Sequence, residues 1–242
     1  MFARMSCGRS CGCPSDLRAA RRAVAGSRRA DREGRVHNER MGRAGIYVEI
    51  EIRSSIERVW QLTQQPTLHP RWDLRFSSIE PTQELAGGGY RFRYERRLPL
   101  HTIVGTGTSV GERSRPDGTR TSALRFTTDD WLSPLGQGRG YWRYVPSATG
   151  VTFITGYDYA PGWGRLLDAL ILRRFIGWMT AWSFDRLRIW AETGVEPEAW
   201  PPASVLMFWK RDRPRASRCR RMPRRGPALR DAPRTLGSLE AP

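Results

Sequence analysis

Lysine is almost absent from this chain, although the chain is strongly basic. Lys210 is the only lysine among the 41 basic residues, and the formal net charge is +17. A protein selected for phosphate contacts would accept either cation, because lysine is also a good phosphate ligand. The one-sided use of arginine therefore indicates a coding bias, and it weakens the case for nucleic-acid binding that the charge alone would make.

Cysteine is missing from the whole central part of the chain. The four cysteines are Cys7, Cys11, Cys13 and Cys219, so no disulfide framework holds residues 45–197. This pattern fits a reducing compartment and predicts a cytoplasmic protein. The three N-terminal cysteines have no partner pair at zinc-finger spacing, so we predict no metal site, and nothing in the sequence points to a cofactor.

Long apolar runs and nucleophile motifs are absent as well. No stretch of about 20 consecutive apolar residues occurs, so the sequence contains no candidate membrane-spanning helix. Residues 1–30 contain arginines throughout and lack an apolar core, which predicts that the chain carries no export signal. There is no G-x-S-x-G motif and no P-loop, so the sequence assigns no catalytic residue.

The excess charge lies at the two ends of the chain. Residues 1–45 contain 11 arginines against 4 acidic residues, whereas residues 46–196 contain 19 against 16. Residues 197–242 are again basic and are rich in proline. Such compositions cannot bury enough apolar surface to offset the entropy of ordering. We therefore predict two disordered basic tails, 1–44 and 198–242, on either side of one domain at 45–197.

The domain begins with a strand and two short helices. Apolar and polar residues alternate from Ile46 to Ile52, which predicts a half-buried strand. A capping-box spacing begins at Ser54 and predicts the start of a helix. Pro66 and Pro70 then limit two short helical pieces. Trp72 follows, and we expect it to fasten the second piece to the sheet.

Six further strand candidates follow, separated by turn signals. They lie in "RFSSIEP", "GGGYRFRYERRL", "TIVGTGTSVGE", "TRTSALRFTTDD", "GRGYWRYVP" and "GVTFITGYDYAP". Short connections between successive strands predict an antiparallel sheet. From Trp163 to Glu192, apolar residues recur at three- and four-residue steps, which predicts one long amphipathic helix that ends at Gly194. The predicted class is α+β.

This order of elements resembles the helix-grip fold, in which a seven-stranded curved antiparallel sheet wraps around a long C-terminal helix and two short helices follow the first strand. The resemblance covers residues 45–195, and its most specific parts are "VEIEIRSSIERVWQLTQQPTLHPRWD" and the final helix. The START lipid-transfer domains, the birch-pollen-allergen family and the bacterial polyketide cyclase/dehydrase group, together the SRPBCC superfamily, share this fold. The resemblance implies a cavity between sheet and helix, and it carries no catalytic residue with it.

Aromatic side chains are the best candidates for the wall of such a cavity, because tyrosine hydroxyls add polar handles to an apolar surface. Some of them must be plain core. By alternation Asp158 should face outward, and Arg174 and Asp185 either flank the apolar helix face or orient a polar ligand head. The candidate ligand-binding residues are Trp72, Tyr90, Phe92, Tyr94, Phe153, Tyr157, Tyr159, Phe175, Trp178 and Trp182.

These features predict a protein that binds a hydrophobic or aromatic small molecule, as a carrier, a sensor or an accessory protein. One alternative is a cyclase or dehydrase that folds a polyketide-like chain and moves protons with Tyr or Asp/Arg groups. Another is nucleic-acid or membrane-surface binding through the basic tails, although we expect no specific nucleic-acid partner. Paired titratable groups facing the cavity would favour the enzyme.

Overall fold

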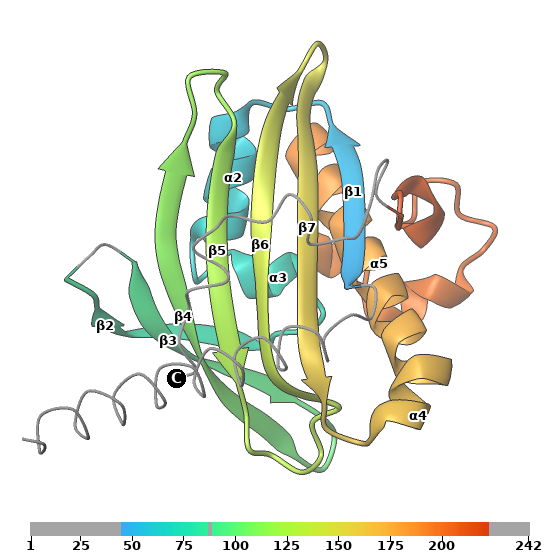
Figure 1. Cartoon of the computed structure of the whole chain (residues 1–242). Helices are drawn as coiled ribbons and strands as arrows, with labels where there is room; N and C mark the ends of the chain where they lie inside the picture. Colours follow the sequence, from blue (N-terminus) through green and yellow to red (C-terminus); the bar gives the residue numbers. More distant parts are fainter. Residues whose placement is uncertain (1–44, 87–88, 223–242) are drawn as a thin grey trace, which may run out of the picture. The chain divides into compact units, whose positions relative to one another are not determined.

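A computed structural model describes residues 45–86 and 89–222 of the chain (Figure 1). In this part of the chain, seven strands form one antiparallel sheet in the order β1-β7-β6-β5-β4-β3-β2. The predicted α+β class and the seven-stranded sheet are confirmed. The strands are β1 (Ile46–Ile52), β2 (Ser78–Glu84), β3 (Tyr90–Arg97), β4 (Thr102–Ser114), β5 (Arg120–Thr127), β6 (Leu135–Ser147) and β7 (Gly150–Pro161).

The first strand closes one edge of the sheet and contributes half of its residues to the core. Its pairing with β7 sets Ile46 opposite Tyr157 and Ile50 opposite Phe153. Every second side chain, from Ile46 through Val48 and Ile50 to Ile52, is buried. This is the period of two that the sequence shows, and it places the apolar face of β1 against the C-terminal helix.

Two short helices follow β1, as predicted. The helix α2 (Ile56–Gln64) is capped by Ser55, whose hydroxyl accepts a hydrogen bond from the Arg58 N–H at 3.2 Å, so the cap lies one residue after the predicted Ser54. The helix α3 (His69–Trp72) is held to α2 by the Trp72 indole N–H, which donates to the Leu62 carbonyl at 2.9 Å.

The long C-terminal helix is also present. It runs through α4 (Arg165–Leu167), a π-helical turn η1 (Asp168–Leu172) and α5 (Arg173–Thr193), and the sheet curves around it (Figure 1). Gly194 ends it in the left-handed conformation, with φ of 76°, and its N–H bonds to the Trp190 carbonyl. Trp182 and Phe184 of α5 are fully buried in the core, where Phe184 contacts the rings of Trp72 and Phe153.

Residues 198–222 correct the prediction of a disordered C-terminal tail. They form three 3-10 turns, η2 (Pro197–Ala199), η3 (Pro202–Leu206) and η4 (Ala216–Arg218), and return to the sheet beside β1 (Figure 1). There Arg220 makes an antiparallel bridge with Glu49, with both backbone hydrogen bonds at 2.8 Å. The predicted tails at 1–44 and 223–242 lie outside the described residues.

Buried acid groups of the domain explain why this basic segment is ordered. The Asp185 carboxylate in α5 is fully buried and accepts the Arg215 N–H at 2.7 Å and the Arg218 guanidinium at 2.8 Å. The Cys219 thiol donates to the Ala181 carbonyl at 3.1 Å. The composition predicted disorder because it treats every arginine as a solvated charge, whereas Arg218 and Arg220 pair with the carboxylates of Asp185 and Glu49.

Candidate functional site: a cavity between the sheet and the C-terminal helix

A cavity of about 250 Å³ lies between the sheet and the C-terminal helix. Its lining comes from the segment after α3, from strands β3 to β7 and from the first half of the helix. The wall is mostly apolar, as expected for a small-molecule site. Representative lining residues are Leu74, Phe76, Ile103, Phe126, Trp142 and Ile176.

Glycines let aromatic rings lie close to the strands at this cavity. A Cβ at Gly105 of β4 would lie 2.2 Å from the ring of Tyr94, which stands opposite it on β3. A Cβ at Gly140 of β6 would lie 2.5 Å from the Cβ of Tyr157. Both tyrosines line the cavity. The glycines in "VGTGT" and "GQGRG" therefore make room for the rings that form the wall.

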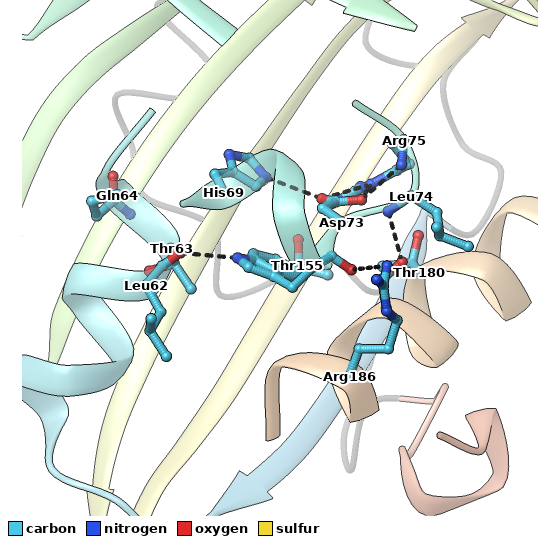
Figure 2. Close-up of polar contacts among 12 residues, drawn as sticks. Leu62, Thr63, Gln64, His69, Asp73, Leu74, Arg75, Thr155, Thr180 and Arg186 are labelled. Carbon is cyan, nitrogen blue, oxygen red and sulfur yellow. Dashed lines mark hydrogen bonds and ion pairs between the residues drawn. The ribbon is translucent and has the colours of Figure 1, made fainter. Parts of the chain in front are cut away.

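A buried polar cluster fixes one end of the cavity. Asp73, directly after α3, is fully buried and binds the Arg75 guanidinium through both carboxylate oxygens, at 2.6 Å in the shortest contact. His69 Nε2 lies 3.1 Å from the other side of the same carboxylate. Figure 2 shows His69 and Arg75 on the two sides of Asp73. The next residue, Leu74, donates its N–H to the Ser183 hydroxyl of α5 at 3.1 Å. The cluster thus ties the loop after α3 to the C-terminal helix.

The ionisation of this cluster follows from its burial. Burial alone would raise the pKa of Asp73, but Arg75 and His69 outweigh burial and hold that pKa well below its ordinary value. Burial lowers the pKa of His69, and the bond to Asp73 opposes this only in part. Asp73 and Arg75 are therefore a charged pair, and His69 is a neutral ring packed among Trp72, Phe76 and Trp142.

Two tyrosine hydroxyls and two arginines are the strongest polar groups in the wall. The Tyr157 hydroxyl bonds to Thr180 of α5 at 2.8 Å, and the Arg75 guanidinium lies 5.2 Å from the centre of the Tyr157 ring. The Tyr94 hydroxyl donates to the Thr127 carbonyl at 3.3 Å. Burial raises the pKa of both tyrosines, so both hydroxyls are protonated at neutral pH.

Arg96 is a charged residue in the cavity wall that lacks a partner for its guanidinium. It stands on the same face of β3 as Tyr94, two residues further on, and it lines the cavity. Among the residues that the structure describes, its guanidinium has no hydrogen-bond or ion-pair partner. Burial lowers its pKa, and Asp73 opposes this only from a distance. A guanidinium in this position can bind an anion with little competition from the protein.

The ten predicted ligand-binding residues divide between the cavity and the core. Tyr94, Tyr157 and Phe175 line the cavity, and their contact with a ligand stays a prediction. Trp178 is half-buried and stacks on Phe175, with ring centres 6.0 Å apart. The other six do not line the cavity and lie in the adjoining apolar clusters: Trp72, Phe153, Tyr159 and Trp182 in the main core, and Tyr90 and Phe92 in a smaller cluster with Tyr94.

Two charged groups, Asp158 and Asp185, are placed differently from the sequence prediction, whereas Arg174 flanks the helix face as one of the two alternatives predicted. Asp158, expected to face outward, is buried, because the Arg173 guanidinium of α5 covers it and donates to its carboxylate at 2.8 Å. Asp185 is buried and anchors the C-terminal segment. Arg174 is exposed and lies outside the cavity lining.

Sequence reasoning did not single out the two arginines of the wall. A signal for Arg96 was present, since it continues the face of Tyr90, Phe92 and Tyr94, where a charged side chain breaks an otherwise aromatic series. For Arg75 there was no comparable signal, because it follows α3 in an irregular segment with no period.

A family model for polyketide cyclase/dehydrase and lipid transport proteins matches residues 43–192, more than half of the chain. The chain belongs to this family. The match covers β1 through almost all of α5, which are the elements that surround the cavity. The resemblance drawn from the sequence is therefore confirmed, and the family's name covers both chemistry and transport.

A relative from Bacillus subtilis (strain 168) corrects one prediction. It is named "Uncharacterized membrane protein YndG" and is 40% identical over 166 residues, which are 66% of this chain and 62% of that protein. The chain thus spans less than two thirds of its relative's length. The relative's name overturns the predicted cytoplasmic location. Among the described residues, no helix of this chain has the length and apolar character needed to cross a membrane.

Solved structures share the fold. The di-domain aromatase/cyclase StfQ from the steffimycin biosynthetic pathway matches with a TM-score of 0.53 at 13% identity, over 74% of this chain and 61% of that one. A STAR-related lipid transfer protein from Xanthomonas axonopodis matches with a TM-score of 0.43 at 16% identity, over 58% of this chain and 81% of that one. At this level of identity, the likeness to StfQ shows the helix-grip fold alone.

Proposed function

We propose that this domain binds a small amphipathic molecule, with an apolar body in the cavity and an anionic head group on Arg96. The observation that carries the proposal is a guanidinium that lines an apolar cavity without a partner among the described residues. A partly desolvated charge is unfavourable until an opposite charge or a hydrogen-bond acceptor meets it. A carboxylate, sulfate or phosphate head would supply both, because two of its oxygens can accept the paired N–H groups of a guanidinium.

The size of the cavity supports a small ligand. Its volume is about 250 Å³, close to the lower end of the roughly 300–1,000 Å³ typical of small-molecule pockets. A fused aromatic system or one short acyl chain fits this space better than a lipid with two acyl chains. The aromatic wall, with Phe126, Trp142 and Tyr157, favours a flat or flexible apolar body.

A pair of matched fluorescent probes tests the proposal. Anilinonaphthalene sulfonate and phenylnaphthylamine share one ring system, and the first alone carries an anionic group. We expect both probes to bind and to gain fluorescence, and the sulfonate to bind more tightly. If neither probe binds the folded protein, or if the neutral probe binds more tightly at low salt, the proposal is wrong.

A cyclase activity is the second candidate, and one observation favours it. The Tyr157 hydroxyl, held by Thr180 and close to the Arg75 guanidinium, lies in the cavity wall as a protonated phenol that could act as a general acid. When the enol form of a chain folded in the cavity attacks a carbonyl carbon of the same chain, a carbon–carbon bond forms. The phenol would then give its proton to the carbonyl oxygen, and the proton released by the enol would restore the phenol. Loss of turnover of a polyketide-like thioester in Tyr157→Phe, with unchanged probe binding, would favour this candidate over simple binding.

A further inference from the structure

The first part of the C-terminal helix is apolar on both of its sides. Leu172 and Ile176 face the interior, with 9% and 2% of their surfaces exposed. Leu166, Leu170 and Ile171 face outward, with 75%, 59% and 58% exposed. The sequence predicted one apolar face that packs on the sheet, and the usual arrangement sets polar residues on the other. The outward apolar residues therefore need an explanation other than core packing.

Exposed aromatic residues extend this outward surface at both ends. Trp131, after β5, is 79% exposed, and its carbonyl accepts the Trp163 indole N–H at 3.1 Å. Phe175, more than half exposed, continues the surface along α5. Trp163 and Phe175 also line the cavity, so the surface lies at the cavity's edge. We define the apolar helix face as Trp131, Trp163, Leu166, Leu170, Ile171 and Phe175.

The charges around the apolar helix face are mainly positive. Arg165 and Arg174 are both exposed, and Arg174 has no hydrogen-bond or ion-pair partner among the described residues. Between Ala160 and Phe184 the only acidic residue is Asp168, which is fully buried and bonds to Arg173 at 3.0 Å. Asp129, near Trp131, is the exposed acid closest in sequence. The helix thus offers cations and no exposed acid.

We propose that the apolar helix face docks on the surface of a lipid bilayer that contains anionic lipids. Leucine, isoleucine and phenylalanine side chains would enter the boundary between head groups and acyl chains, as in helices that lie in the membrane interface. Tryptophans favour the head-group level, where an apolar ring and a polar N–H are both satisfied. The arginines would meet lipid phosphates, since anionic leaflets attract basic groups close to their surface.

A bilayer fits this face better than a second copy of the chain. A twofold contact between copies would place the same arginine-bearing helix against itself, because the same patch occurs on both sides of such an interface. Since Trp163 and Phe175 belong to both the face and the cavity wall, docking would bring the edge of the cavity to the lipid. This consequence rests on the proposed ligand binding, whereas docking itself does not.

Vesicle flotation with the full chain tests the proposal. Phosphatidylcholine vesicles are compared with phosphatidylcholine vesicles that contain phosphatidylglycerol, without added ligand. We expect the protein to float with the anionic vesicles. Leu166→Ser/Leu170→Ser/Ile171→Ser should weaken this partitioning by about tenfold or more, because three apolar side chains no longer enter the interface. Arg174→Gln should weaken it by about fivefold on the anionic vesicles only.

A matched control replaces apolar residues exposed elsewhere. Leu206, Phe208 and Trp209 are 74%, 75% and 65% exposed, and their triple serine variant should float like the parent protein. The helix variant should still bind phenylnaphthylamine, which shows that it is folded. Vesicle binding that is unchanged in the helix variant, or lost in the control, would overturn the assignment. So would no flotation of the parent protein, or self-association that only the helix variant abolishes.

Discussion

Arg75 and Arg96 line the same cavity, yet only Arg75 has an acidic partner among the residues that the structure describes. Asp73 contacts the Arg75 guanidinium through both of its oxygens, at 2.6 Å in the closest contact. Burial alone would lower the pKa of Arg75, but Asp73 outweighs burial and raises it, whereas burial lowers the pKa of Arg96. Arg75 is thus held in an ion pair that stabilises the fold, and Arg96 is available to bind a ligand.

Replacing Arg96 distinguishes the contribution of a ligand's head group to the affinity from that of its apolar body. Arg96→Met should weaken binding of anilinonaphthalene sulfonate by about tenfold or more, because hydrogen bonds to charged groups contribute roughly 1.5–3 kcal/mol. It should leave phenylnaphthylamine binding unchanged. Fluorescence titration at low and high salt measures both affinities. Arg91→Met, on the exposed face of the same strand, is the control. Equal loss for the two probes would show that Arg96 shapes the cavity and does not select charge.

Truncation of Trp182 should mainly lower the stability of the protein, whereas truncation of Phe175 should mainly change the affinity for a probe. Trp182 is 1% exposed and belongs to the core, so Trp182→Ala should lower the free energy of unfolding by about 3–5 kcal/mol. Phe175 is 53% exposed and lines the cavity, so Phe175→Ala should cost less than about 1 kcal/mol. Probe affinity should change in Phe175→Ala alone. Urea unfolding and probe titration of both variants check this, and a large stability loss in Phe175→Ala would contradict it.

The C-terminal segment should protect a thiol. Burial, with Asp185 nearby, raises the pKa of Cys219, and alkylating reagents need the thiolate. Cys219 should therefore react slowly in the native protein. Arg218→Ala removes the 2.8 Å contact to Asp185 and should speed this reaction by allowing the segment to open locally. Mass spectrometry of the Cys219 peptide measures the rate. Arg221→Ala, at an exposed neighbour, should leave the rate unchanged. If Arg221→Ala speeds the reaction as much as Arg218→Ala does, the contact between Arg218 and Asp185 does not protect the thiol.

The fold was predictable because its signals are local and periodic. The alternation in Ile46–Ile52, the prolines around α3 and the long apolar helix each predict an element without knowledge of its neighbours. Which face of each element meets a cavity depends on strands far apart in the chain. Six predicted aromatic residues therefore pack in apolar clusters outside the cavity lining, whereas Arg96, in phase with an aromatic series, lies in the cavity wall.

The charged residues show the limit of sequence reasoning most clearly. Asp158, Asp168 and Asp185 are all buried, and each forms an ion pair with an arginine that lies between 3 and 33 residues away. The same aspartate and arginine residues appear in the sequence whether they are solvated or form a buried ion pair, so no local pattern distinguishes the two cases. The order of residues 198–222 was missed for this reason, because Arg218 and Arg220 pair with acids on α5 and β1.

His69 should make the protein less stable in mild acid. Its folded-state pKa lies below the ordinary value of 6.5, first because the ring is buried, and the bond to Asp73 opposes this only in part. As pH falls below about 6.5, the unfolded chain therefore binds a proton before the folded protein does, and stability is lost by up to about 1.4 kcal/mol per pH unit. The depressed pKa of Asp73 acts in the same direction, but only in strong acid, as the pH falls through its folded value.

The variant His69→Gln isolates this effect. Glutamine can still donate an N–H towards Asp73, which lies 3.1 Å from His69 Nε2, but it does not titrate. Urea unfolding between pH 8 and 5 should show a stability that is level above about pH 7 and falls below about pH 6.5 in the parent protein. In His69→Gln the fall should be much smaller, whatever the offset in stability from repacking against Trp72 and Trp142. An equally steep fall in the variant would mean that His69 is not the group that takes up the proton. A rise in the parent's stability on acidification would mean that the bond to Asp73 outweighs burial and that His69 is charged in the folded protein.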